Sequence, residues 1–281
     1  MAAVNSLTLV DTAELHDRLD NENPLVLLDC RFDLFDIGLG RRLFDDDHIP
    51  GAQYVDLNQD LSDIIKPGVT GRHPLPQRDV FLKTAAAWGI SDDTQVIAYD
   101  ADNGAYAARL WWMMRWLGHA NVSVLNGGFA AWCGEQRVVS RDLHHLPKGF
   151  LSQRQPITRQ VNAKDLLSKP EAIIDARDRK RFSGESEPVD PIAGHIPGAI
   201  CMPFTENMAD GKFKPKAALL AQYDQAGISP SQAPICYCGS GVTAAHHILA
   251  LKHAGFPEPS LYPGSWSEWI NQPEHPIETG D

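Results

Sequence analysis

The five residues His48-Ile49-Pro50-Gly51-Ala52 occur twice in this sequence, the second time as His195-Ile196-Pro197-Gly198-Ala199. Before each copy stands an apolar run that ends in an acid and an arginine, at residues 25–31 and 172–177. Runs of this kind are typical of buried strands in parallel sheets. Chance reuse of such a pattern is improbable, so the repeat indicates that the chain contains the same structural unit twice.

The two copies keep matching further along the chain. Residues 96–100 correspond to residues 234–238, and each is a short apolar strand that leads into a glycine-containing turn and a helical pattern. Residues 125–132 correspond to residues 262–269, where a strand end precedes a glycine turn and a short helix. This alternation predicts an α/β fold with two tandem domains, each an open, mostly parallel sheet with helices on both faces.

The repeat also predicts the domain boundaries. Residues 140–158 contain prolines and a glycine among polar residues and show little periodicity, as expected of a linker. We therefore expect a first domain at residues 1–139 and a second domain at residues 159–281.

Composition excludes two classes of partner. The chain is 43% hydrophobic, yet no apolar run approaches the roughly 20 residues that a membrane-spanning helix requires. The net charge of -11 would repel phosphate backbones, so we expect no nucleic acid partner. The five cysteines show neither a zinc-type spacing nor a dense disulfide pattern, and the N-terminus lacks a secretion signal, which predicts a reducing compartment, the cytoplasm.

The clearest chemical signature is the loop Cys238-Gly239-Ser240-Gly241-Val242-Thr243, which follows a buried strand and opens a helix. Its two glycines let the backbone wrap tightly and turn successive N–H groups inward. These groups and the helix N-terminus create a positive potential that stabilises a thiolate or a persulfide anion. A cysteine in such a setting has a lowered pKa and reacts as the thiolate, so we interpret Cys238 as a nucleophile.

The sequence resembles the rhodanese superfamily over nearly its whole length. The resemblance rests on this loop, on both His-Ile-Pro-Gly-Ala segments and on residues 264–269. The loop is similar to that of 3-mercaptopyruvate sulfurtransferases rather than to the basic loop of thiosulfate-using rhodaneses. The resemblance implies that Cys238 takes sulfur from 3-mercaptopyruvate as a persulfide, releases pyruvate, and passes the sulfur to thioredoxin, a small thiol or cyanide, without a metal or an organic cofactor.

The resemblance also implies roles for single residues. Asp100 stands at the place of Cys238 in the first repeat and would leave that domain catalytically silent. Arg181 would hold the substrate anion, and His73 would lie at the cleft between the domains. The 3-mercaptopyruvate enzymes usually carry a second arginine, but residues 184–193 contain none, which leaves open how the substrate carboxylate is gripped. The loop would contribute five further substrate-binding residues, Gly239, Ser240, Gly241, Val242 and Thr243.

Other functions fit part of the sequence. The same chemistry on thiosulfate is favoured by the missing arginine, but Gly239 and Ser240 are neutral where a basic pair would attract a dianion. A non-catalytic tandem scaffold fits the first domain but not the Cys238 loop. A cysteine phosphatase would need an arginine that closes the loop, and Thr243 and Ala244 stand there instead.

Overall fold

The chain forms two compact units in the computed structural model, which describes residues 8–19, 24–168 and 172–280. Unit 1 comprises Met1–Ser62, Pro76–Ile157 and Asp210–Lys212, and unit 2 comprises Asp63–Leu75, Thr158–Ala209 and Phe213–Asp281. The segment at residues 63–75 therefore belongs to unit 2, although it comes from the N-terminal half of the sequence.

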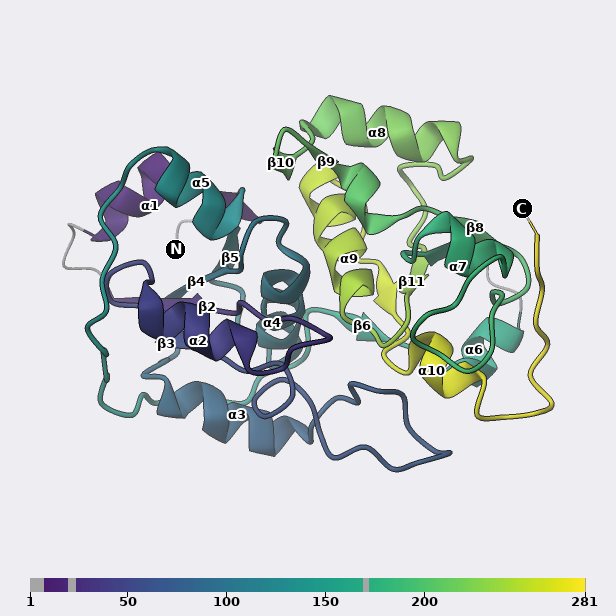
Figure 1. Cartoon of the computed structure of the whole chain (residues 1–281), viewed down its shortest axis with the longest axis horizontal. Coiled ribbons are helices and arrows are strands. Elements are labelled where there is room, and N and C mark those ends of the chain that lie inside the picture. Colours follow the sequence, from purple (N-terminus) through teal and green to yellow (C-terminus); the bar gives the residue numbers. More distant parts are fainter. Residues whose placement is uncertain (1–7, 20–23, 169–171, 281) are drawn as a thin grey trace. The chain divides into compact units, whose positions relative to one another are not determined.

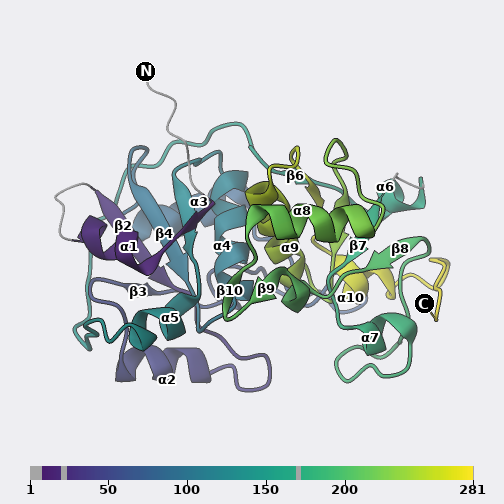
Figure 2. The same ribbon diagram turned by 90° about the horizontal axis from the view of Figure 1, so that it is seen from above.

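Unit 1 is built around a five-stranded parallel sheet with the strand order β1-β5-β4-β2-β3. Figures 1 and 2 show helices on both sides of this sheet. Its elements, in chain order, are β1 (Leu9–Val10), α1 (Thr12–Leu19), β2 (Leu25–Asp29), α2 (Leu39–Asp46), β3 (Gln53–Tyr54), α3 (Arg78–Ala87), β4 (Gln95–Tyr99), α4 (Ala105–Trp116), β5 (Val122–Leu125) and α5 (Gly128–Gly134).

The second half of the chain repeats this sheet with the order β6-β12-β11-β7-β8, also parallel throughout, and adds a separate two-stranded sheet of β9 and β10. The same strand order in both sheets confirms the predicted duplication and fold class. Its elements are β6 (Arg159–Gln160), α6 (Ala163–Leu167), β7 (Ile173–Asp175), α7 (Arg179–Ser183), β8 (Ala199–Cys201), η1 (Phe204–Asn207), β9 (Met208–Ala209), β10 (Lys212–Phe213), α8 (Lys216–Gln225), β11 (Ile235–Tyr237), α9 (Thr243–Ala254), β12 (Ser260–Leu261) and α10 (Ser265–Trp269).

Each sheet buries both of its faces. Because successive strand residues point to opposite faces, Leu27, Ile97 and Tyr99 share one face of the first sheet and pack with side chains of α1, α2 and α5. In unit 2, Ile173, Ile235 and Tyr237 pack with α6 and α10 in the same way. The helices α4 and α9 pack against the central strands of the two sheets. This two-sided burial explains why the strands read as continuous apolar runs.

The strand-to-helix turn of unit 1 is filled by a side chain of the turn itself. Asp100 follows β4 at the place that Cys238 holds after β11. Its carboxylate accepts hydrogen bonds from the backbone N–H groups of Gly104 at 2.9 Å, Tyr106 at 2.9 Å and Ala107 at 3.2 Å. These amides form an anion-binding nest at the start of α4, and the chain supplies the anion itself.

No helix in the described ranges is long and apolar enough to cross a membrane.

The buried carboxylate of Asp100 predicts a pH-dependent contribution to stability. Burial raises its pKa from 3.8 to about 6, although three backbone hydrogen bonds oppose the shift. Because the folded state binds this proton more tightly, the group's contribution is fully present below pH 3.8 and is lost as the pH rises through about 6. Relative to Asp100→Asn, we expect the free energy of unfolding of the unsubstituted protein to fall by about 2 to 3 kcal/mol between pH ~4 and ~7. Urea denaturation over this range measures the difference, and parallel profiles would contradict the assignment.

Candidate active site

The reactive loop is fixed by the central strand of the unit 2 sheet and by one glycine. The strand β11 ends at Tyr237, and Cys238 opens the turn into α9 with only 2% of its surface exposed. Gly241 adopts φ +77°, and a Cβ atom there would lie 2.5 Å from the carbonyl oxygen of Pro263. Glycine is therefore required at this position both by conformation and by space.

Hydrogen bonds around the sulfur lower the pKa of Cys238. Burial alone would raise the pKa of the thiol, but the Thr243 hydroxyl and the backbone N–H groups of Ser240, Ala244 and Gly241 donate to the sulfur and outweigh the burial. The Gly241 nitrogen lies 3.1 Å from Sγ. The turn therefore binds an anionic sulfur better than a neutral one, as expected of backbone amides that converge at the start of a helix.

The other four cysteines lack this environment. Burial raises the pKa of the Cys30 and Cys236 thiols, and it raises that of Cys201 to about 12. Cys133 is exposed, and its pKa is also raised. All five cysteines are unpaired, so Cys238 is the one thiol among them with a lowered pKa.

The first residues of α10 form hydrogen bonds that fix the backbone of the loop. The backbone N–H of Cys238 donates to Ser265 Oγ at 3.1 Å, and that hydroxyl donates in turn to the carbonyl of Tyr262 at 2.9 Å. The N–H groups of Trp266 and Ser267 donate to the carbonyls of Cys238 and Gly239. Ser265 holds these contacts with φ +55°, a left-handed conformation that serine rarely adopts. The sequence did not indicate a role for Ser265.

The segment at residues 63–75 contributes side chains to the same loop. His73 is buried, and its Nδ1 lies 2.7 Å from Ser240 Oγ. The backbone N–H of Arg72 donates to Ser267 Oγ at 3.1 Å, and Asn271 Nδ2 donates to the carbonyl of Thr70 at 3.1 Å. His73 and Ser240 were predicted separately from the sequence, and the structure brings them together. The predicted position of His73 at an interdomain cleft stays a prediction.

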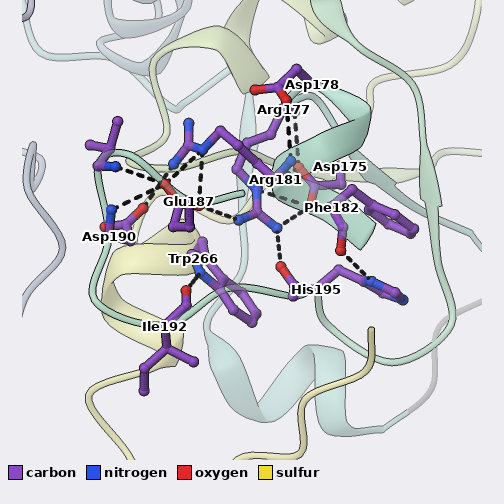
Figure 3. A network of polar contacts seen from close by, with 12 residues as sticks. Asp175, Arg177, Asp178, Arg181, Phe182, Glu187, Asp190, Ile192, His195 and Trp266 are labelled. Atoms are coloured by element: carbon purple, nitrogen blue, oxygen red, sulfur yellow. Dashed lines mark hydrogen bonds and ion pairs between the residues drawn. The ribbon is translucent and has the colours of Figure 1, made fainter. Parts of the chain in front are cut away.

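Arg181 lies in the network of polar contacts drawn in Figure 3, and one member of that network, Asp190, also pairs with Arg72 of residues 63–75. It comes from α7, whose N-cap is the side chain of Asp178. Its Nε donates to both carboxylate oxygens of Glu187 at 2.8 and 2.9 Å, and its Nη2 donates to Asp190 at 2.9 Å. The second oxygen of Asp190 accepts from Arg72 Nη1. Arg181 therefore faces two carboxylates of its own chain.

Glycine at position 239 makes room for both guanidinium groups. A Cβ atom on Gly239 would lie 2.6 Å from Arg72 Nη2 and 3.3 Å from Arg181 Nη2. The structure thus gathers the predicted residues Cys238, Ser240, Thr243, Arg181 and His73 around one loop. Val242, also predicted, is buried at the N-cap of α9.

Besides Ser265, sequence reasoning missed Arg72 and Asp190 at this loop. Arg72 neighbours the predicted His73, and this adjacency was the available signal. Asp190 falls in the stretch where a second arginine was sought, and an acid there gave no positive signal. In the described part of the chain, no group of three or more His, Cys, Asp or Glu side chains is arranged to hold a metal ion.

Comparisons with known proteins identify the family of this chain. A family model for the rhodanese-like domain matches residues 11–135 and 160–272. A Pseudomonas aeruginosa protein named as a probable 3-mercaptopyruvate sulfurtransferase is 44% identical over 99% of this chain and 100% of its own. A Mycobacterium tuberculosis relative with the provisional name thiosulfate sulfurtransferase is 37% identical over 97% of each chain.

A solved structure extends the comparison to the fold. The 3-mercaptopyruvate sulfurtransferase from Leishmania major superimposes with a TM-score of 0.83 at 29% sequence identity, covering 94% of this chain and 74% of that one. The family model matches both halves of the sequence, and each half carries the same five-stranded parallel sheet. The chain therefore belongs to the rhodanese family and contains two rhodanese-like domains.

Proposed function

We propose that this protein is a sulfurtransferase in which Cys238 takes sulfur from 3-mercaptopyruvate and passes it on from a persulfide. The observation that carries the proposal is the turn at the start of α9, where the Gly241 nitrogen lies 3.1 Å from Cys238 Sγ and hydrogen bonds to the sulfur lower its pKa. A thiolate is the nucleophile in sulfur transfer, and the same amides suit a persulfide anion. The curated relative from Pseudomonas aeruginosa, which matches the whole chain, carries the name of this activity.

The first step breaks one bond and forms one. The Cys238 thiolate attacks the sulfur of 3-mercaptopyruvate, an S–S bond forms, and the C–S bond electrons leave with the carbon as the enolate of pyruvate. The enolate takes up a proton and departs as pyruvate. The persulfide loses its proton and stays in the turn as an anion until an acceptor thiolate attacks the outer sulfur and restores the Cys238 thiolate.

The surrounding residues suit a small keto acid. Arg181 supplies a cationic group beside Gly239 for the substrate carboxylate. We assign to the Ser240 hydroxyl, whose Oγ lies 2.7 Å from His73 Nδ1, a hydrogen bond to the substrate carbonyl and so to the developing enolate. We assign the loop residues Gly239 to Thr243 to substrate and persulfide binding, through their backbone amides and the Thr243 hydroxyl.

We propose that the first domain, at residues 1–139, performs no transfer chemistry of its own. Its turn carries Asp100, which has no sulfur and already fills the anion nest with a carboxylate. The second domain, at residues 159–281 after a linker at residues 140–158, would then carry out the reaction with the help of the segment at residues 63–75.

We further propose a thiol acceptor, either thioredoxin or a small thiol, with cyanide as an alternative acceptor, and we propose the cytoplasm as the compartment. A persulfide that faces these nucleophiles transfers its outer sulfur by simple displacement. Five unpaired cysteines suit a reducing environment, where such thiols are abundant.

Thiosulfate is a second candidate donor because the Mycobacterium tuberculosis relative carries that name. Attack of Cys238 on its outer sulfur would expel sulfite and give the same persulfide. Against it, Gly239 and Ser240 supply no cationic side chain for a dianion. The two donors predict different products, so they can be distinguished directly.

Donor and nucleophile can be tested together. With 3-mercaptopyruvate as the donor, we expect pyruvate release and one added sulfur on the Cys238 peptide, both lost in Cys238→Ser because serine forms no persulfide. Cys133→Ser, which removes the exposed thiol, is the matched control and should retain full activity. Pyruvate assay and peptide mass spectrometry measure the two outcomes. Loading from thiosulfate alone would reassign the donor, and loading from neither would remove the proposed function.

The thiolate environment predicts a pH shift on removal of the Thr243 hydroxyl. Because that hydroxyl donates to the sulfur and lowers the pKa of Cys238, Thr243→Val should raise this pKa. The rate of Cys238 alkylation by iodoacetamide should then rise with pH along a curve displaced to higher pH, while Thr243→Ser retains the original curve. Superimposable curves for the valine variant and the unsubstituted protein would refute the role of the hydroxyl.

A further inference from the structure

A second arginine reaches the catalytic loop from an unexpected part of the chain. Residues 184–193 contain no arginine, and the structure places Asp190 there instead. The carboxylate of Asp190 is 3% exposed and accepts hydrogen bonds from Arg181 and from Arg72, which lies 118 positions earlier in the sequence. Two guanidinium groups therefore flank one buried carboxylate.

Both guanidinium groups lie against the residue after the nucleophile. The position that a Cβ of Gly239 would take is 2.6 Å from Arg72 Nη2 and 3.3 and 3.6 Å from the two Nη atoms of Arg181. Arg72 also retains an unused donor, because its Nε is buried without a hydrogen-bond partner among the described residues. An anionic group bound beside Gly239 could thus receive hydrogen bonds from both arginines.

The charges of this network cancel. Its cations are Arg72, Arg177 and Arg181, and its anions are Asp175, Glu187 and Asp190. A site without surplus positive charge gives a dianion little net attraction, whereas a single carboxylate can still pair with a guanidinium fork. Asp190 is the anion that contacts both arginines nearest the loop, so its charge offsets part of the attraction that each of them exerts on a ligand.

We propose that Arg72 is the second arginine that contacts the anionic group of the sulfur donor, beside Arg181, and that Asp190 positions these two guanidinium groups and limits their charge. The inference rests on the proposed function for the identity of the donor. It assigns to a residue of the N-terminal half a substrate contact in the second rhodanese-like domain. It also makes Asp190 the residue that favours a monocarboxylate over thiosulfate.

The inference can be tested without sulfur transfer. Iodoacetate and iodoacetamide both alkylate a thiolate with loss of iodide, but iodoacetate carries a carboxylate where iodoacetamide carries a neutral amide. The ratio of the iodoacetate to the iodoacetamide rate constant at Cys238 therefore reports how well the site binds an anion. A change in the fraction of Cys238 present as thiolate affects both rates equally and cancels in this ratio. In Arg72→Met we expect this ratio to fall about tenfold or more, because a charge-assisted hydrogen bond to the carboxylate is lost. Arg179→Met is the matched control, since Arg179 lies on α7 but pairs with Glu206, and its ratio should not change.

Asp190→Asn completes the test. It removes one negative charge and keeps the shape of the side chain, so the ratio of the iodoacetate to the iodoacetamide rate constant should rise. Thiosulfate should also gain as a donor relative to 3-mercaptopyruvate.

The iodoacetamide rate checks that the Arg72 variant keeps an intact loop. A rate in Arg72→Met equal to that of the unsubstituted protein shows that the loop is intact. If that rate collapses, the ratio is measured in Arg72→Gln instead, because glutamine keeps a hydrogen-bond donor for Asp190. An unchanged ratio in the variant with an intact loop would overturn the role of Arg72. An unchanged or lower ratio in Asp190→Asn would overturn that of Asp190. Failure of the proposed function would appear separately, as absent pyruvate release.

Discussion

Backbone amides that converge at the end of a central parallel strand need an anion, and both halves of this protein are organised around that requirement. In unit 2 the anion is the sulfur of Cys238, and in unit 1 it is the carboxylate of Asp100. The two turns have different sequences but meet the same electrostatic demand. A loop that presents several N–H groups inward is costly to leave empty when buried, so a side chain of suitable charge becomes part of the fold.

The same demand explains why the unit 1 turn cannot be regarded as a degenerate copy. Asp100 accepts three backbone hydrogen bonds with its two oxygens, so its turn is occupied by an anionic acceptor just as the turn around the Cys238 sulfur is. The acid at this position gives the turn an acceptor for its inward N–H groups but no reactive sulfur. The raised pKa of Asp100 shows that burial still opposes its charge.

The sequence predicted those parts of the site that are contiguous in the chain. The repeat of His48 to Ala52 at His195 to Ala199 indicated two equal sheets, and the strand, the two glycines and the helix around Cys238 are local features that determine the turn. Arg72 and Asp190 could not be found in this way, because their importance depends on the packing of residues 63–75 against a unit formed mostly by the other half of the chain. From charge alone, an acid such as Asp190 would be expected to repel an anionic substrate. Its role is recognised only when its two arginine partners are known.

The exchange of residues 63–75 between the halves bears on how such a duplicated gene can evolve. The segment is encoded within the first repeat, yet its Thr70, Arg72 and His73 form hydrogen bonds with residues of the second repeat. Deletion of the first repeat would therefore remove more than a domain without a nucleophile. It would also remove Arg72 and His73, whose side chains lie against Gly239 and Ser240 of the reactive loop. The first repeat thus encodes part of the surroundings of Cys238, and the second repeat on its own would lack these residues.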